Sequence, residues 1–162
     1  MRSRVLVAVA VTGLASGVSA APLWTVERSG TAYLLFGEPG NPILTISCGL
    51  EDGESGRDET RIEVAVETGT KAGTDKAVLR VMEEKASTEL PLKPLVCGGP
   101  SGCETRPDGE VYRYETSVPG KTLALDIAGK AKALSIDAPG AKFTAPADPA
   151  AFKKFRVSCL NW

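Results

Sequence analysis

The residues of this chain best suited to chemistry are its four cysteines, Cys48, Cys97, Cys103 and Cys159. Thiols form disulfides or, as thiolates, bind a metal ion. Zinc sites combine cysteine with histidine or use C-x-x-C pairs, and the chain has no histidine and no such pair. An even number of cysteines is typical of a disulfide framework in an exported protein. We therefore expect two disulfides, no metal site and no cofactor.

The pairing of the cysteines follows from the elements that carry them. Four cysteines can pair in three ways, and their spacing alone does not choose among these. Alternating apolar and polar residues over 43–48 predict a half-buried strand with Cys48 on its inner face. Phe152, Phe155 and Cys159 fall on one stripe of a predicted helix. We therefore predict a bridge from Cys48 to Cys159 that pins this helix across the sheet, with the other two cysteines paired locally.

The local bridge, Cys97–Cys103, encloses a run of small residues that forms a candidate binding loop. The loop consists of Gly98, Gly99, Pro100, Ser101 and Gly102. A constrained loop loses less entropy when it binds, and protein inhibitors insert such loops into the clefts of enzymes. The alternative is a surface loop that the bridge merely holds in place.

The missing histidine excludes most familiar catalytic arrangements. Serine and cysteine triads need histidine as the general base, and no S-x-x-K motif supplies a lysine instead. Gly120-Lys121-Thr122 resembles the end of a phosphate-binding loop, but Glu115 stands where that loop needs glycine. Carboxylates alone can hydrolyse a sugar, but the adjacent Glu83 and Glu84 would point to opposite faces of a strand. We expect a protein without enzymatic activity, with a small carboxylate-dependent hydrolase as the alternative.

Acidic residues gather in the polar segment 49–60. Calcium prefers carboxylate oxygens, but these acids do not follow the spacing of a calcium-binding EF-hand loop, and Arg57 lies among them. We expect a solvated loop rather than a calcium site.

Most of the segments that position the cysteines and the other candidate residues have the residue pattern of β-strands. In the clearest one, Ile62, Val64 and Val66 form an apolar face opposite charged side chains. Pro91 and Pro94 cannot donate hydrogen bonds to a neighbouring strand, so the strand beside them is expected at an edge. Strands are predicted at residues 23–28, 32–38, 43–48, 61–67, 77–83, 87–92 (the edge strand), 111–118 and 133–138.

Two segments are typical of helices. Asp148 suits the N-cap of a C-terminal helix, and Pro149 suits its first position. Residues 122–130 fit both a strand and a short helix ended by Gly129, and we favour the helix. The expected fold is mainly β, either a β-sandwich or a curled antiparallel sheet, with the C-terminal α-helix packed on it and disulfides bracing it.

The N-terminus has the pattern of a secretory signal. Arg2 and Arg4 precede an apolar run over residues 5–14, and small residues stand before Ala21. We predict that residues 1–20 are a cleaved signal peptide and that residues 21–162 form a single β-rich domain, periplasmic or secreted. The run is too short to span a membrane, so no span is expected after cleavage.

The charge of the mature chain argues against nucleic acid as a partner. Cleavage would leave 17 of the 19 basic residues beside 20 acidic ones, a net charge of −3. Nucleic-acid-binding proteins normally present a strongly basic face. The densest basic cluster, Lys153, Lys154 and Arg156, suits the solvated face of a helix.

The layout resembles small exported proteins of Gram-negative bacteria and, through a few positions, the invasion-associated locus B family. Residues 97–104, with their Cys-Gly-Gly-Pro-Ser-Gly-Cys-Glu run, are similar to that family's central cysteine and glycine–cysteine element, and Trp24 to its early tryptophan. The chain lacks a cysteine soon after this tryptophan, and Cys159 is additional. The resemblance implies an envelope-associated role and carries over no functional residue. We expect a non-catalytic binding or envelope-associated domain with a protein partner, or an inhibitor of a secreted hydrolase; the composition predicts no oligomeric state.

Overall fold

The computed structural model describes residues 23–49, 58–73, 75–99, 102–106 and 109–161. The predicted signal peptide and most of the acidic loop lie outside these residues. Ten strands and two helices follow one another in the order β1 (Leu23–Ser29), β2 (Thr31–Glu38), β3 (Asn41–Cys48), β4 (Glu59–Ala65), β5 (Ala77–Met82), β6 (Ser87–Gly99), β7 (Gly102–Glu104), β8 (Arg113–Pro119), α1 (Thr122–Lys130), β9 (Ala133–Ala138), β10 (Ala141–Pro146) and α2 (Pro149–Leu160).

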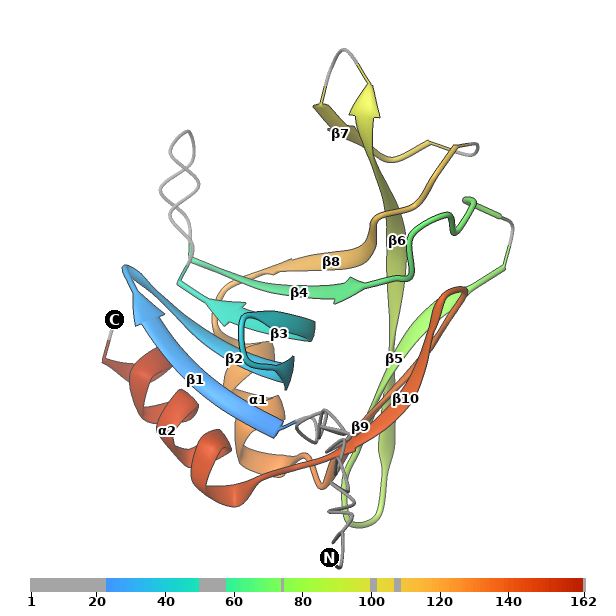
Figure 1. Cartoon of the computed structure of the whole chain (residues 1–162). Coiled ribbons are helices and arrows are strands. Elements are labelled where there is room, and N and C mark those ends of the chain that lie inside the picture. The colour runs from blue at the N-terminus through green and yellow to red at the C-terminus, as the bar shows by residue number, and fades with distance from the viewer. Residues whose placement is uncertain (1–22, 50–57, 74, 100–101, 107–108, 162) are drawn as a thin grey trace, which may run out of the picture.

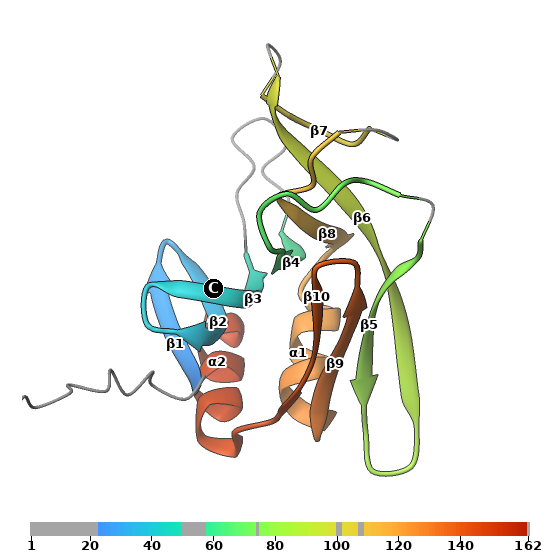
Figure 2. The ribbon, with the colours of Figure 1, turned by 45° about the vertical axis from the view of Figure 1, so that its right-hand side comes forward.

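The strands form one antiparallel sheet that curls around the two helices. Its order is β1-β2-β3-β4-β8-β6-β5-β9-β10, and β7 pairs with β6 beside this path. Helix α2 packs on β1 and β2, while α1 contacts β3 and β4. Seen from the side, the helices lie between the β1–β3 part of the sheet and the part formed by β5, β9 and β10 (Figure 2). The predicted curled antiparallel sheet with a C-terminal helix packed on it is confirmed.

Strand β6 is longer than predicted and joins the two halves of the sheet. The prediction was a short edge strand over 87–92, but β6 continues to Gly99. Residues 87–92 pair with β5, residues 93–95 with β8, and residues 96–99 with β7. Pro91 pairs only towards β5 and Pro94 only towards β8. Each proline therefore lies where the strand has a partner on one side, which a residue without an N–H donor tolerates.

The sequence patterns did not predict two strands. Short β7 turns back along the end of β6, and the two project beyond β8 and β4 (Figure 1). Strand β10 pairs with β9 and brings Phe143 onto Phe36 of β2, with stacked rings whose centroids lie 5.7 Å apart. The curl therefore brings the β10 edge of the sheet back towards its first strands.

Both helices confirm their predictions. The Asp148 carboxylate accepts hydrogen bonds from the backbone N–H groups of Ala150 (2.8 Å) and Ala151 (3.2 Å), as an N-cap should. Phe152 and Phe155 are buried beneath the sheet. Residues 122–130 are helical, the favoured reading of that segment. The inner faces of the strands and both helices share one core, whose largest fully buried side chains are Tyr114, Phe155, Leu34, Leu44, Ile46, Ile62, Leu79, Ile127, Leu134, Ile136, Val64 and Val111.

Candidate functional site

The two disulfides have the predicted pairing but lie in different environments. Cys48 and Cys159 are both fully buried, and their bridge joins the end of β3 to the last turn of α2. Cys97 and Cys103 face each other across β6 and β7, with Cys103 exposed. One disulfide therefore lies inside the core and the other lies at the surface.

Three of the five residues of the candidate binding loop belong to the strands of a hairpin. Gly98 and Gly99 belong to β6 and Gly102 belongs to β7, with Gly99 opposite Gly102. Pro100 and Ser101, the two residues between them, lie outside the described residues. The described part of the candidate loop is therefore strand and not free loop.

A hollow of about 390 Å³ lies at the base of this hairpin. Its floor is the face of β3, β4 and β8 that points away from the helices, because its strand residues alternate with the buried ones. The exposed disulfide forms one side, and Tyr112, 45% exposed, lines it as well. The lining residues are Pro42, Thr45, Glu63, Ala65, Cys97, Cys103, Tyr112 and Arg113.

A second hollow of about 400 Å³ continues the first across β1 and β2. It shares Pro42 and Thr45 with the first, so the two are contiguous on one face of the sheet. Its other lining residues are Thr25, Glu27, Tyr33, Leu35, Gly37, Glu38, Pro39 and Gly40. We call the two hollows together the outer groove.

Charged side chains near the hairpin end of the outer groove are incompletely matched. Glu63 stands directly opposite Glu115 on the neighbouring strand, an arrangement of like charges that destabilises a sheet. Arg113 lies 3.7 Å from a carboxylate oxygen of Glu63 through its Nη1 atom. Its Nε atom is buried without a hydrogen-bond partner in the described part of the chain. Such a donor is costly unless a further acceptor reaches it.

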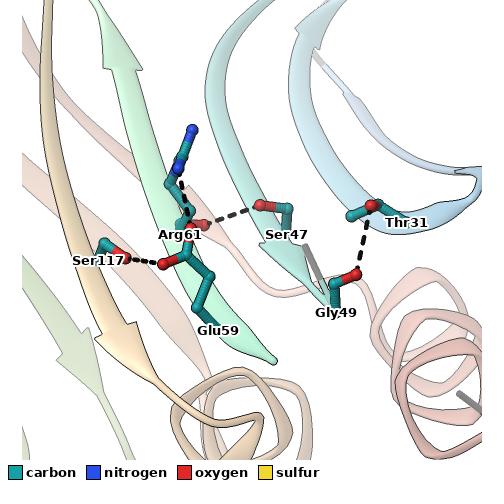
Figure 3. A network of polar contacts seen from close by, with 6 residues as sticks. All are labelled: Thr31, Ser47, Gly49, Glu59, Arg61 and Ser117. Atoms are coloured by element: carbon teal, nitrogen blue, oxygen red, sulfur yellow. Dashed lines mark hydrogen bonds and ion pairs between the residues drawn. The ribbon is translucent and has the colours of Figure 1, made fainter. Parts of the chain in front are cut away.

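The same face carries a polar network next to the groove (Figure 3). The Glu59 carboxylate accepts hydrogen bonds from Arg61 Nη2 (2.9 Å) and from Ser117 Oγ (2.6 Å). Ser47 donates to the Arg61 carbonyl at 3.4 Å. These contacts join β3, β4 and β8 and fix the charged part of the floor.

The residues considered for catalysis do not meet in the outer groove. Glu83 and Glu84 lie in the turn after β5, where the Glu83 N–H donates to the Ala86 carbonyl at 2.8 Å. Gly120 and Lys121 form the turn from β8 into α1, and Lys121 Nζ lies 3.3 Å from an Asp58 carboxylate oxygen. This is the ordinary turn that the sequence favours over a phosphate loop.

The opposite half of the sheet presents a different surface. Arg80 pairs with Glu89 at 2.7 Å and approaches Asp137 at 3.8 Å, and Asp137 also pairs with Lys142 at 3.1 Å. The hydrogen bond that Arg80 Nε donates to the Glu89 carboxylate, together with the negative charge of Glu89, raises the pKa of Arg80. Alternating charges thus cross β6, β5, β9 and β10 and keep that surface solvated.

Three further observations concern the basic cluster on α2, metal-binding side chains and membrane-spanning helices. Lys153, Lys154 and Arg156 are exposed on α2, as expected for a solvated helix face. Among the described residues, no three or more histidine, cysteine or acidic side chains are grouped as a metal site. None of the helices in that part of the chain has the length and apolarity needed to cross a membrane.

Reasoning from the sequence did not identify the outer groove, although it placed Glu63 on the polar face of its strand. The groove combines outward-facing residues from strands that are distant in sequence, and the alternation pattern marks each of them only as facing solvent.

Comparison with known proteins adds no relative to this description. No family model, no curated protein and no solved structure matches the chain.

Proposed function

We propose that the protein is an exported, disulfide-stabilised binding domain without catalytic activity, and that it contacts a protein partner of the cell envelope through the outer groove. The signal pattern of residues 1–20 and the two disulfides support export. The partner surface is the groove together with the hairpin of β6 and β7.

The observation that carries this proposal is the pair of contiguous hollows beside the exposed disulfide. Together they place Tyr112 beside Arg113 and its ion-pair partner Glu63 on one open face. Exposed aromatic side chains and arginine are the residues that dominate protein interfaces. A rigid sheet and a cross-strand bridge hold these groups in place, which lowers the entropy lost on binding.

Inhibition of a secreted hydrolase is the second candidate. It is favoured by the projection of β6 and β7 beyond β8 and β4 (Figure 1). The paired ends of β6 and β7, with Gly99 opposite Gly102, form a narrow hairpin of the kind that can enter a cleft.

Export is tested by mass spectrometry of the protein from periplasmic and culture fractions. We expect a chain that begins at Ala21 and contains two disulfides. A chain that keeps residues 1–20, or that is found reduced in the cytoplasm, would contradict the proposal.

The partner surface is tested by photo-crosslinking in living cells. A photoreactive phenylalanine analogue replaces Tyr112 in one variant and Val157, exposed on α2, in a matched control. We expect a discrete crosslinked envelope protein from position 112 and none from position 157. Equal crosslinking from both positions would contradict a specific surface. Replacement of Ser101 in a third variant would report the hairpin tip, as expected for an inhibitor.

A further inference from the structure

We propose that the outer groove binds an extended, proline-containing segment of the partner that carries a basic side chain at the β1–β2 end. This inference rests on the proposed function and names the chemistry of its ligand.

The direction of the groove sets the conformation of the ligand. The groove runs across the strands from β1 to β8, four strand spacings or about 19 Å. A chain lying across strands cannot pair its backbone with the sheet, as a strand added to a sheet edge does. A polyproline II segment needs no such pairing, because its backbone is fully solvated. About six residues in this conformation span the groove.

The lining suits such a segment. Tyr33 lines one hollow and Tyr112 the other, while Pro42 contributes to both. Grooves that hold polyproline II helices are lined by aromatic side chains, which pack against the proline rings. Two hollows, each with one tyrosine, provide two such contacts.

Charge fixes the direction in which the ligand lies along the outer groove. The carboxylates of Glu27 and Glu38 line the β1–β2 end, whereas Glu63 and Arg113, whose charged groups lie 3.7 Å apart, both line the hairpin end and offset each other's charge. A basic side chain of the ligand is attracted to the acidic end, and the chain's net negative charge strengthens that attraction.

The test is an NMR titration of the mature, oxidised protein with a synthetic peptide amide, Arg-Pro-Pro-Pro-Pro-Pro. Matched peptides replace the arginine by glutamine or the prolines by glycine. We expect saturable shifts in the outer groove, and at least fivefold weaker binding of both matched peptides. Shifts centred elsewhere, equal binding of the three peptides, or no saturable shift up to about 1 mM would overturn the inference.

Variants locate the contacts. Tyr112→Ala and Glu27→Gln should each weaken binding of the arginine peptide at least fivefold, whereas Val157→Ala, a change of an exposed residue on α2, should not. Circular dichroism checks that each variant is folded. Unchanged binding in both groove variants would overturn the inference.

The crosslinking experiment separates this inference from the proposed function. A specific envelope partner crosslinked at position 112 without peptide binding would leave the proposed function standing and overturn the polyproline ligand. A crosslink joining two copies of this chain would also overturn it, because the groove would then serve self-association.

Discussion

The indole Nε1 of Trp24 donates a hydrogen bond of 2.6 Å to the carbonyl of Pro146, 122 residues later in the chain. The bond joins β1 to the end of β10, so the first and last strands of the sheet order are connected by a side chain. The same ring lies 4.9 Å from Phe36 and 4.9 Å from Phe152, edge-on to the latter. Trp24 therefore links both edges of the curled sheet to helix α2.

Replacement of Trp24 should cost more than the loss of an apolar side chain alone. Trp24→Phe keeps an aromatic ring but leaves the Pro146 carbonyl without this donor, a loss of about 1–3 kcal/mol. Trp24→Ala should cost about 3–5 kcal/mol. Urea unfolding measures both, with Val157→Ala as the surface control. A stability of Trp24→Phe equal to that of the control would show that the bond contributes nothing.

The two disulfides should differ in their contribution to stability. Replacing Cys48 and Cys159 together by serine frees a loop of 111 residues, and the chain-entropy model gives about 4–5 kcal/mol for it. The same change at Cys97 and Cys103 frees only 6 residues and should cost about 2 kcal/mol. Thermal unfolding of the two double variants makes the comparison. The opposite ranking would place more of the stability in the hairpin than in the core.

Much of the fold was predictable because apolar residues, which form the inner face of the sheet, alternate with polar residues along the strands. Ile62 and Val64 point into the core as their pattern indicated. Strand β10 escaped prediction because Phe143 is its only large apolar residue, and β6 because prolines and glycines obscure its second half. Pairing with another strand determines the conformation in both cases: β10 pairs with β9, the strand just before it, and the second half of β6 pairs with β8 and β7. The pattern of the segment alone does not contain that information.

Gly140 lies in the tight turn between β9 and β10 with φ at +74°, and a Cβ there would overlap the Thr70 hydroxyl. Gly140→Ala combines left-handed strain with this overlap and should cost about 2–4 kcal/mol. Gly30 offers a matched control, because its φ is +73° and a Cβ would meet open space. Gly30→Ala should cost only about 1 kcal/mol.

A double variant separates the two causes at Gly140. Gly140→Ala should lower the free energy of unfolding less in the Thr70→Ala variant than in the wild type, because the variant lacks the overlapping hydroxyl. Urea midpoints of the four proteins give the coupling. Additive losses would assign the whole effect to backbone strain.

Tyr114 makes the folded state less stable as the pH becomes alkaline. Burial, followed by the negative charge of Asp75, raises the pKa of this phenol above its ordinary value near 10. The folded state therefore holds the proton more tightly than the unfolded state. The resulting stability is fully present below about pH 10 and is lost as the pH rises through the raised value.

The Tyr114→Phe variant cannot ionise, so its stability should fall less steeply above about pH 10 than that of the wild type. Urea unfolding at a series of pH values measures the slopes. Val157→Ala, which changes an exposed residue without an ionisable group, should keep the wild-type slope. Parallel curves for wild type and Tyr114→Phe would contradict the assignment.

The candidate site was less predictable than the fold. Thr45, Glu63 and Arg113 are separated by many residues in the chain, and only the strand order β3-β4-β8 brings them onto one floor. The Cys97–Cys103 bridge was predicted by assigning Cys48 and Cys159 to the inner faces of a strand and a helix, but the hairpin projects beside a hollow that no local pattern describes. Outward-facing residues on a sheet acquire a role only through their neighbours on other strands.

The nested arrangement of the two bridges has a consequence for biosynthesis. In the exported protein that we propose, the cysteines leave the ribosome and enter the oxidising compartment in the order 48, 97, 103 and 159, whereas the first pairs with the last. Oxidation of cysteines as they arrive would join Cys48 to Cys97, which is not the native bond. Correct maturation therefore requires either that Cys48 stays reduced until α2 has arrived or that an isomerase repairs the early bond, and the yield of native protein should depend on disulfide isomerase activity in the host.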